Sequence, residues 1–143
     1  MSRDEWNQAR AVFEKQLDCL LRDDRDAQME LYAPDLRCEF PFAVDRPRVI
    51  DGRDAFRDVM TPMWKEARQR GWKVLGHEYE FHATDEPGLY VARFTLDVAL
   101  GDGRSSLPFV QFLRIEGGLI TEVKEYFNPA ARAGLRDTPA SSA

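Results

Sequence analysis

One carboxylate in the last predicted strand is the side chain of this sequence best placed for acid–base chemistry. Residues 119–128 have the two-residue period of a half-buried strand, which puts Val123, Glu125 and Phe127 on one face. Because an unpaired buried carboxylate is costly, Glu125 must be hydrogen-bonded, paired with a cation or protonated, and all three arrangements recur in catalytic pockets. We therefore predict Glu125 as a catalytic residue. In the alternative interpretation this face meets solvent, or Glu125 pairs with an arginine at a wet rim.

A polar amide is predicted beside this carboxylate. Gln111 shares a face with Phe109 and Leu113 in the preceding predicted strand, and a turn at residues 117–118 joins the two strands. In antiparallel neighbours, Gln111 and Glu125 are expected within a few residues of each other on the concave face, which allows a direct or a substrate-bridged hydrogen bond. In a pocket, Gln111 would bind a substrate oxygen while Glu125 moves a proton. Alternatively, the two side chains satisfy each other inside an apolar core.

A histidine is the second candidate for acid–base catalysis. His77 shares a face with Tyr79 and Phe81, and the imidazole group titrates near neutral pH. The alternative is a hydrogen-bonded histidine in the core or at its rim. Tyr79 is predicted to donate a phenolic hydrogen bond to a substrate oxygen.

Further predicted substrate-binding residues are apolar and mostly aromatic, as in most small-molecule pockets. They are Phe40, Phe42, Met60, Trp64, Phe94, Phe109 and Phe127. The same side chains would also suit an ordinary core. The sequence has no histidine and cysteine cluster with metal-ligand spacing, no phosphate-binding glycine-rich loop and no G-x-S-x-G turn. We therefore predict neither a metal nor another cofactor.

The elements that must position these residues fall into two halves. Apolar spacing predicts helices over residues 4–22 and 27–32 and a short strand over 36–43, and residues 51–54 open a third helix that Gly71 ends. Pro62 is expected to kink the third helix. A two-residue period then predicts four strands, 72–83, 89–100, 105–115 and 119–128. Segregated helices and strands indicate an α+β fold with helices covering one face of a curved antiparallel sheet.

Composition limits the classes of partner. With 143 residues we expect a single domain over 1–129 and a flexible tail over 130–143. The 25 acidic and 20 basic residues give a formal charge of −5, which argues against nucleic-acid or anionic-membrane binding. No apolar run approaches the roughly 20 residues of a membrane span. Two cysteines and an N-terminus without an apolar signal core predict a reduced, cytoplasmic protein.

Three motifs carry a resemblance to a known family. They are Leu31–Asp35 (LYAPD), Cys38–Ala43 (CEFPFA) and Ile50–Phe56 (IDGRDAF). With the order of elements over residues 6–128, they resemble the SnoaL-like group. That group belongs to the superfamily of ketosteroid isomerase, scytalone dehydratase, limonene epoxide hydrolase and nuclear transport factor. The resemblance implies a cone-shaped, cystatin-type α+β barrel in which the curved sheet wraps around three helices, and a homodimer formed through the outer sheet face.

Two narrower comparisons concern the site. The segment 125–129 (EYFNP) is similar to the closing motif of the PhzA/PhzB phenazine-biosynthesis proteins, which implies an acid–base role for Glu125. The pocket histidine of that family is replaced here by Val59. The catalytic positions of ketosteroid isomerase fall at Gln16, Phe40 and Gln111, none of which can act as a base, so steroid isomerisation by that route is not expected.

The predicted function is that of a cofactor-independent enzyme of secondary metabolism, such as antibiotic biosynthesis. It would isomerise, cyclise, dehydrate or condense a ketone-bearing or polyketide-like small molecule. The alternative is a non-catalytic module that binds a small ligand or acts through its dimer surface. A further alternative is hydrolysis of the limonene-epoxide-hydrolase type. That reaction needs aspartate and arginine on the concave face, whereas Arg93 and Asp97 are predicted on the other face.

Overall fold

The first helix, α1 (Arg3–Arg22), is defined by its caps and by one buried stripe. The computed structural model describes residues 2–130, and residues 131–143 of the predicted tail lie outside the described residues. Ser2 Oγ accepts a hydrogen bond from Glu5 N (3.1 Å), and Asp23 ends the helix in a left-handed conformation (φ 54°). Phe13 and Leu17 of the stripe are fully buried against the sheet. Gln16 lies in the same stripe.

Of the next two helices, the second is short and the third is long. α2 (Arg25–Met29) begins after Asp24, whose Oδ1 accepts from Ala27 N (3.1 Å). It ends earlier than the predicted residue 32, because Leu31 O accepts from Ile120 N (2.8 Å) and draws the chain into the sheet. α3 (Arg53–Gln69) follows Gly52, whose φ of 99° favours glycine, and it contains Pro62.

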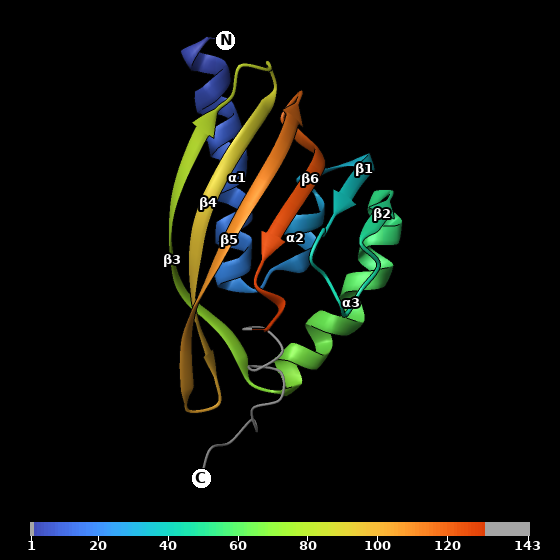
Figure 1. Ribbon diagram of the computed structural model, residues 1–143, viewed down its shortest axis with the longest axis vertical. Coiled ribbons are helices and arrows are strands. Elements are labelled where there is room, and N and C mark those ends of the chain that lie inside the picture. Colours follow the sequence, from blue (N-terminus) through green and yellow to red (C-terminus); the bar gives the residue numbers. More distant parts are fainter. Residues whose placement is uncertain (1, 131–143) are drawn as a thin grey trace.

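Six strands form one curved sheet in the order β2-β1-β6-β5-β4-β3 (Figure 1). The strands are β1 (Tyr32–Glu39), β2 (Val49–Asp51), β3 (Trp72–Ala83), β4 (Leu89–Leu100), β5 (Gly103–Glu116) and β6 (Leu119–Phe127). The four strands from β3 to β6 make the predicted antiparallel meander. β1 pairs with β6 in parallel, so the sheet is mixed rather than wholly antiparallel. The predicted α+β class with a cone-shaped curved sheet around three helices is confirmed.

The first strand differs from its predicted range of 36–43. It ends at Glu39, and a turn follows in which Ala43 N donates to Phe40 O (3.0 Å). Proline at position 41 has no N–H to donate to a neighbouring strand, which agrees with the strand ending before it. The short strand β2, which the sequence did not indicate, then pairs with β1.

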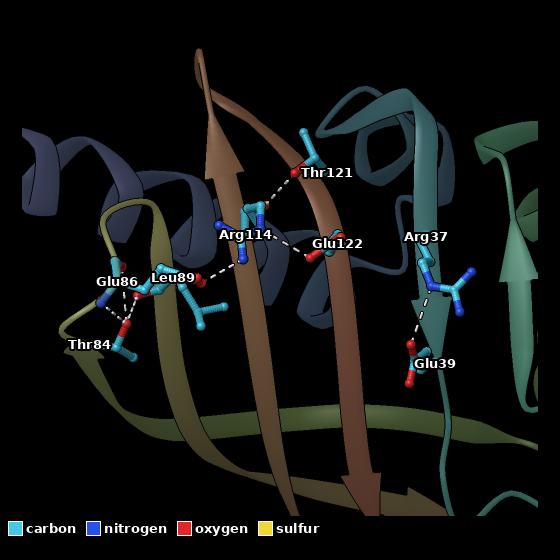
Figure 2. A network of polar contacts seen from close by, with 8 residues as sticks. All are labelled: Arg37, Glu39, Thr84, Glu86, Leu89, Arg114, Thr121 and Glu122. Atoms are coloured by element: carbon cyan, nitrogen blue, oxygen red, sulfur yellow. Dashed lines mark hydrogen bonds and ion pairs between the residues drawn. The ribbon is translucent and has the colours of Figure 1, made fainter.

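The two faces of the sheet differ in polarity. The concave face packs on the helices with a run of aromatic rings that includes Phe13, Phe81 and Phe94. On the opposite face, Arg114 forms ion pairs with Glu86 (2.7 Å) and Glu122 (3.1 Å), while the helices lie behind the strands (Figure 2). Within residues 2–130, no helix is long and apolar enough to cross a membrane.

Candidate functional site

A cavity of about 170 Å³ lies against the concave face of the sheet. Residues of all three helices and of five strands line it. Its apolar wall is largely aromatic and comprises Phe40, Phe56, Met60, Met63, Trp64, Phe94 and Phe109, among others. Nine polar or charged side chains interrupt this wall: Gln16, Arg25, Gln28, Tyr32, Arg46, Glu66, Arg70, Gln111 and Glu125. Small-molecule sites likewise combine an apolar lining with polar groups that orient the ligand.

Glu125 lies in the wall of this cavity, on the concave side of β6. Gln111 of β5 is its direct register partner, and Gln111 Nε2 donates a hydrogen bond to Glu125 Oε1 (2.8 Å). The predicted contact between the two side chains is therefore confirmed. Val123 and Phe127 on the same face are buried, so the alternative of a solvent-exposed face is wrong. Glu125 itself is half-buried.

A chain of hydrogen bonds leads away from Gln111 through three elements. Gln111 Oε1 accepts from Gln16 Nε2 of α1 (3.0 Å), and Gln16 Oε1 accepts from the Tyr32 hydroxyl of β1 (3.0 Å). The Tyr32 oxygen accepts from Gln28 Nε2 (3.0 Å), whose Oε1 accepts from Arg25 Nη1 (2.9 Å). Every donor in the chain points the same way, from the guanidinium group of α2 towards the carboxylate of β6.

The direction of this chain fixes how Gln111 is oriented. Because Gln16 Nε2 occupies the Gln111 carbonyl oxygen, the Gln111 N–H group is the one that faces Glu125. Bonds aligned in series polarise one another, which strengthens the last bond to the carboxylate. Neutral amides are poor proton carriers, so the chain positions Glu125 rather than conducting protons. Burial raises the pKa of Tyr32, which keeps its hydroxyl protonated as a donor to Gln16.

A buried arginine adjoins the same wall. Arg46 lines the cavity, its side chain is 1% exposed, and its Nε donates to Asp45 Oδ1 (2.9 Å). Burial and then the negative charge of Glu125 raise the pKa of the Cys38 thiol, whereas the charge of Arg46 acts in the opposite direction. The carboxylate and the guanidinium group therefore both lie near one thiol of the cavity wall.

Seven predicted site residues lie in the wall of the cavity: Phe40, Met60, Trp64, Phe94, Phe109, Gln111 and Glu125. Phe127 is buried but lies behind the wall, with its ring 6.4 Å from that of Phe40. Phe42 is 56% exposed and packs on Tyr126, because the turn after β1 carries it out of the sheet. The prediction that Phe42 faces the cavity is wrong.

The polar residues of β3 also lie outside the cavity wall. β3 is an edge strand with a register shift between Val74 and Gly76, and His77 is exposed on it. Tyr79 is half-buried, accepts from Arg10 Nε (3.0 Å) and packs edge-on against Phe13. Neither side chain is placed for the predicted contact with a ligand in this cavity.

Several cavity residues were not predicted from the sequence. Gln16 carried a signal, because it is a polar residue in the apolar stripe of α1. No sequence pattern singled out Gln28 or Tyr32, apart from their polar side chains. Arg46 lies in a loop without periodicity. Within residues 2–130, no group of three or more histidine, cysteine, aspartate or glutamate side chains is arranged to hold a metal ion.

This curved sheet on three helices is the cone-shaped fold of the nuclear-transport-factor-like class. The model of the SnoaL-like domain family matches residues 13–123, and the chain therefore belongs to that family. No match among curated proteins was found.

Solved structures with this fold carry several names. A candidate isomerase from Bacillus subtilis has a TM-score of 0.77 at 19% identity, with 91% of each chain covered. A candidate polyketide cyclase from Xanthomonas campestris has a TM-score of 0.69 at 17% identity, covering 93% of this chain and 99% of that one. An LEH-like epoxide hydrolase from M. tuberculosis has a TM-score of 0.63 at 18% identity, covering 92% of this chain and 90% of that one.

Proposed function

We propose that this protein is a cofactor-independent acid–base enzyme of secondary metabolism that acts on a flat, ketone-bearing molecule of aromatic or polyketide-like type. Glu125 is the catalytic base. One observation carries the proposal: the carboxylate lies in an apolar cavity wall with Gln111 bonded to Oε1. No other hydrogen bond to Glu125 occurs within residues 2–130, so Oε2 is available to a ligand.

The chemistry needs only this chain and the substrate. Glu125 takes a proton from the carbon beside the ketone, and the C–H electron pair forms a C=C bond while the carbonyl oxygen becomes an enolate. Return of the proton to another carbon completes an isomerisation. Attack of the enolate carbon on a second carbonyl closes a ring, and the new alkoxide takes the proton back from Glu125. Such general acid–base assistance contributes about 10²- to 10⁴-fold in rate.

The names of the structural neighbours support this class of reaction. They include a candidate isomerase and a candidate polyketide cyclase, whereas a third neighbour is named as an epoxide hydrolase. Epoxide hydrolysis through Arg93 and Asp97 is not favoured, because both are exposed and pair with Glu80 and Ser106 on the outer face.

A model ketone tests the proposal. The bicyclic ketone 2-tetralone exchanges its α-hydrogens for deuterium in D₂O, and NMR measures the rate. We expect wild-type protein to accelerate this exchange and Glu125→Gln to lose about 10²-fold or more of the acceleration. Glu122→Gln is the matched control, because Glu122 lies on the same strand but on the outer face (Figure 2). Equal acceleration by Glu125→Gln and wild type would rule out Glu125 as the base, and a wild type that does not accelerate the exchange would leave a binding protein rather than an enzyme.

We also propose that the outer sheet face forms a homodimer with a second copy of the chain. Phe42 and Phe112 are exposed there, with their rings 5.5 and 6.1 Å from that of Tyr126. Exposed aromatic clusters of this kind are enriched at interfaces. Light scattering measures the oligomeric state. We expect wild type to be a dimer and Phe112→Ser to dimerise more weakly, and a monomeric wild type would contradict the assignment.

A further inference from the structure

Arg46 is held in the cavity wall by contacts that leave one end of its guanidinium group open. Its Nε and Nη2 donate to the two oxygens of Asp45 at 2.9 and 3.2 Å, a bidentate pair. The group also lies over the rings of Phe40 and Phe127, at 4.9 and 5.3 Å from their centroids. These contacts fix the plane of the guanidinium group.

The other end of the group, formed by Nη1 and Nη2, has little to bind. Within residues 2–130, its one further partner is the Met60 sulfur, 3.8 Å from Nη1, and a thioether is a weak acceptor. Met60 and Arg46 both line the cavity, so this end of the guanidinium group adjoins the space available to a ligand. A guanidinium group carries five N–H donors, and the Nη1–Nη2 end matches the two oxygens of a carboxylate or one enolate oxygen.

Burial of Arg46 also favours its interaction with an anionic oxygen of a ligand. Little solvent competes at Arg46, because its side chain is 1% exposed. A charge-assisted hydrogen bond is stronger in such surroundings than in water.

We propose that Arg46 is the anion-recognition residue of this cavity and that the substrate presents a negatively charged oxygen to its Nη1–Nη2 end. This inference rests on the proposed function. The oxygen is either a carboxylate already on the substrate or the enolate oxygen that forms when Glu125 removes the α-proton. In the second case the C–H electron pair forms the new C=C bond, and the π electron pair of the C=O bond moves onto the oxygen that Arg46 binds. Asp45 is a positioning residue for this arginine.

Three naphthalene probes test the inference by calorimetry. 2-Naphthoate carries a permanent carboxylate, 2-acetylnaphthalene is its neutral counterpart, and 2-naphthol resembles an enol that can ionise. The double substitution Asp45→Asn/Arg46→Met removes both members of the ion pair and leaves the net charge unchanged. Arg46→Lys keeps the charge without the planar fork and serves if the double variant does not fold. Arg93→Met, on the outer face, is the control.

We expect wild type and Arg93→Met to bind 2-naphthoate at least about tenfold more tightly than 2-acetylnaphthalene, as one charge-assisted bond would provide. The double variant should lose this preference, and Arg46→Lys should reduce it. If the anionic oxygen is that of an enolate, 2-naphthol bound to wild type should show the absorption of its naphtholate anion. This absorption should be lost in the double variant and weaker in Arg46→Lys. The inference is overturned if wild type shows neither the preference for 2-naphthoate nor the naphtholate absorption of bound 2-naphthol. It is also overturned if the double variant or Arg46→Lys keeps the wild-type result in full.

The outcome can be separated from that of the proposed function. If Arg46 supports anion preference while Glu125→Gln keeps full 2-tetralone exchange, the catalytic role of Glu125 fails and the anion site remains. If Glu125→Gln loses exchange while no anion preference is found, the catalytic role stands and the role of Arg46 is wrong.

Discussion

Gln111 and Glu125 lie directly opposite each other on β5 and β6, and the amide of the first donates to the carboxylate of the second over 2.8 Å. The amide cannot turn to present its oxygen instead, because Gln16 occupies that oxygen. Glu125 is thus the last acceptor of a chain that begins at a cation in α2. Held in this way, the carboxylate keeps Oε1 bound, while within residues 2–130 no hydrogen bond to Oε2 is found.

Removing the amide should therefore impair catalysis by misplacing the base. We expect Gln111→Leu to lower the rate of 2-tetralone exchange by about tenfold, the equivalent of one hydrogen bond to a charged group. NMR measures the rate, and calorimetry checks that the ketone still binds. An unchanged rate with unchanged affinity would mean that Gln111 does not position Glu125.

Tyr32 is the middle of the chain, and its hydroxyl serves two buried glutamines. Tyr32→Phe leaves Gln16 Oε1 and Gln28 Nε2 without this partner, which should lower the free energy of unfolding by about 1–3 kcal/mol. Urea denaturation measures the change. Tyr126→Phe on the outer face is the control and should change stability by about 0.5 kcal/mol or less. Equal effects of the two substitutions would contradict a structural role for the chain.

The same tyrosine gives a dependence of stability on alkaline pH. Its ordinary pKa is 10.0 and burial raises the pKa in the folded state, so the unfolded chain releases the proton first. The contribution of Tyr32 to the free energy of unfolding is present in full below about pH 10, and it is lost as the pH rises towards the folded-state pKa. The slope for one proton is about 1.4 kcal/mol per pH unit. Tyr32→Phe should remove this contribution to the slope, and an identical slope in both proteins would refute it.

Cys38 reports the charge of Glu125 from inside the cavity. Burial and then Glu125 raise the pKa of its thiol, and only the thiolate reacts readily with iodoacetamide. In a Cys19→Ala background, where Cys38 is the one remaining cysteine, native protein should react slowly at pH 8. Adding Glu125→Gln removes a negative charge and should increase the alkylation rate several-fold, whereas Glu122→Gln should not. Mass spectrometry follows the reaction, and equal rates in all three would place Glu125 away from this thiol.

The sequence predicted the meander well, and it placed Gln111 and Glu125 on neighbouring strands, because both expectations depend on local pattern. β3 and β4 have the predicted bounds, 72–83 and 89–100, and in β4 the alternation of burial runs over all twelve residues. The short turn at residues 117–118 makes β5 and β6 neighbours, but a register shift between Arg114 and Ile115, which no local pattern indicated, brings Gln111 directly opposite Glu125. The helix predicted over 27–32 ended early because Leu31 bonds to β6, a contact that no local pattern reveals.

The rest of the site depends on how distant segments fold over one another. Arg46 is buried because its loop closes over Phe40 and Phe127, and nothing in the residues around position 46 indicates that packing. The hydrogen-bond chain likewise requires α1, α2 and β1 to meet at Gln16, Gln28 and Tyr32. His77 fits the pattern of an inward-facing residue, yet it is exposed next to the register shift between Val74 and Gly76 on the edge strand β3.

A crystal structure of the protein with 2-tetralone tests the central claim most directly. The account predicts the ketone inside the cavity, with an α-carbon about 3–3.5 Å from a Glu125 carboxylate oxygen and with Gln111 still bonded to that carboxylate. A ketone bound elsewhere, or one in the cavity with Glu125 turned away from its α-carbons, would contradict the assignment of Glu125 as the base.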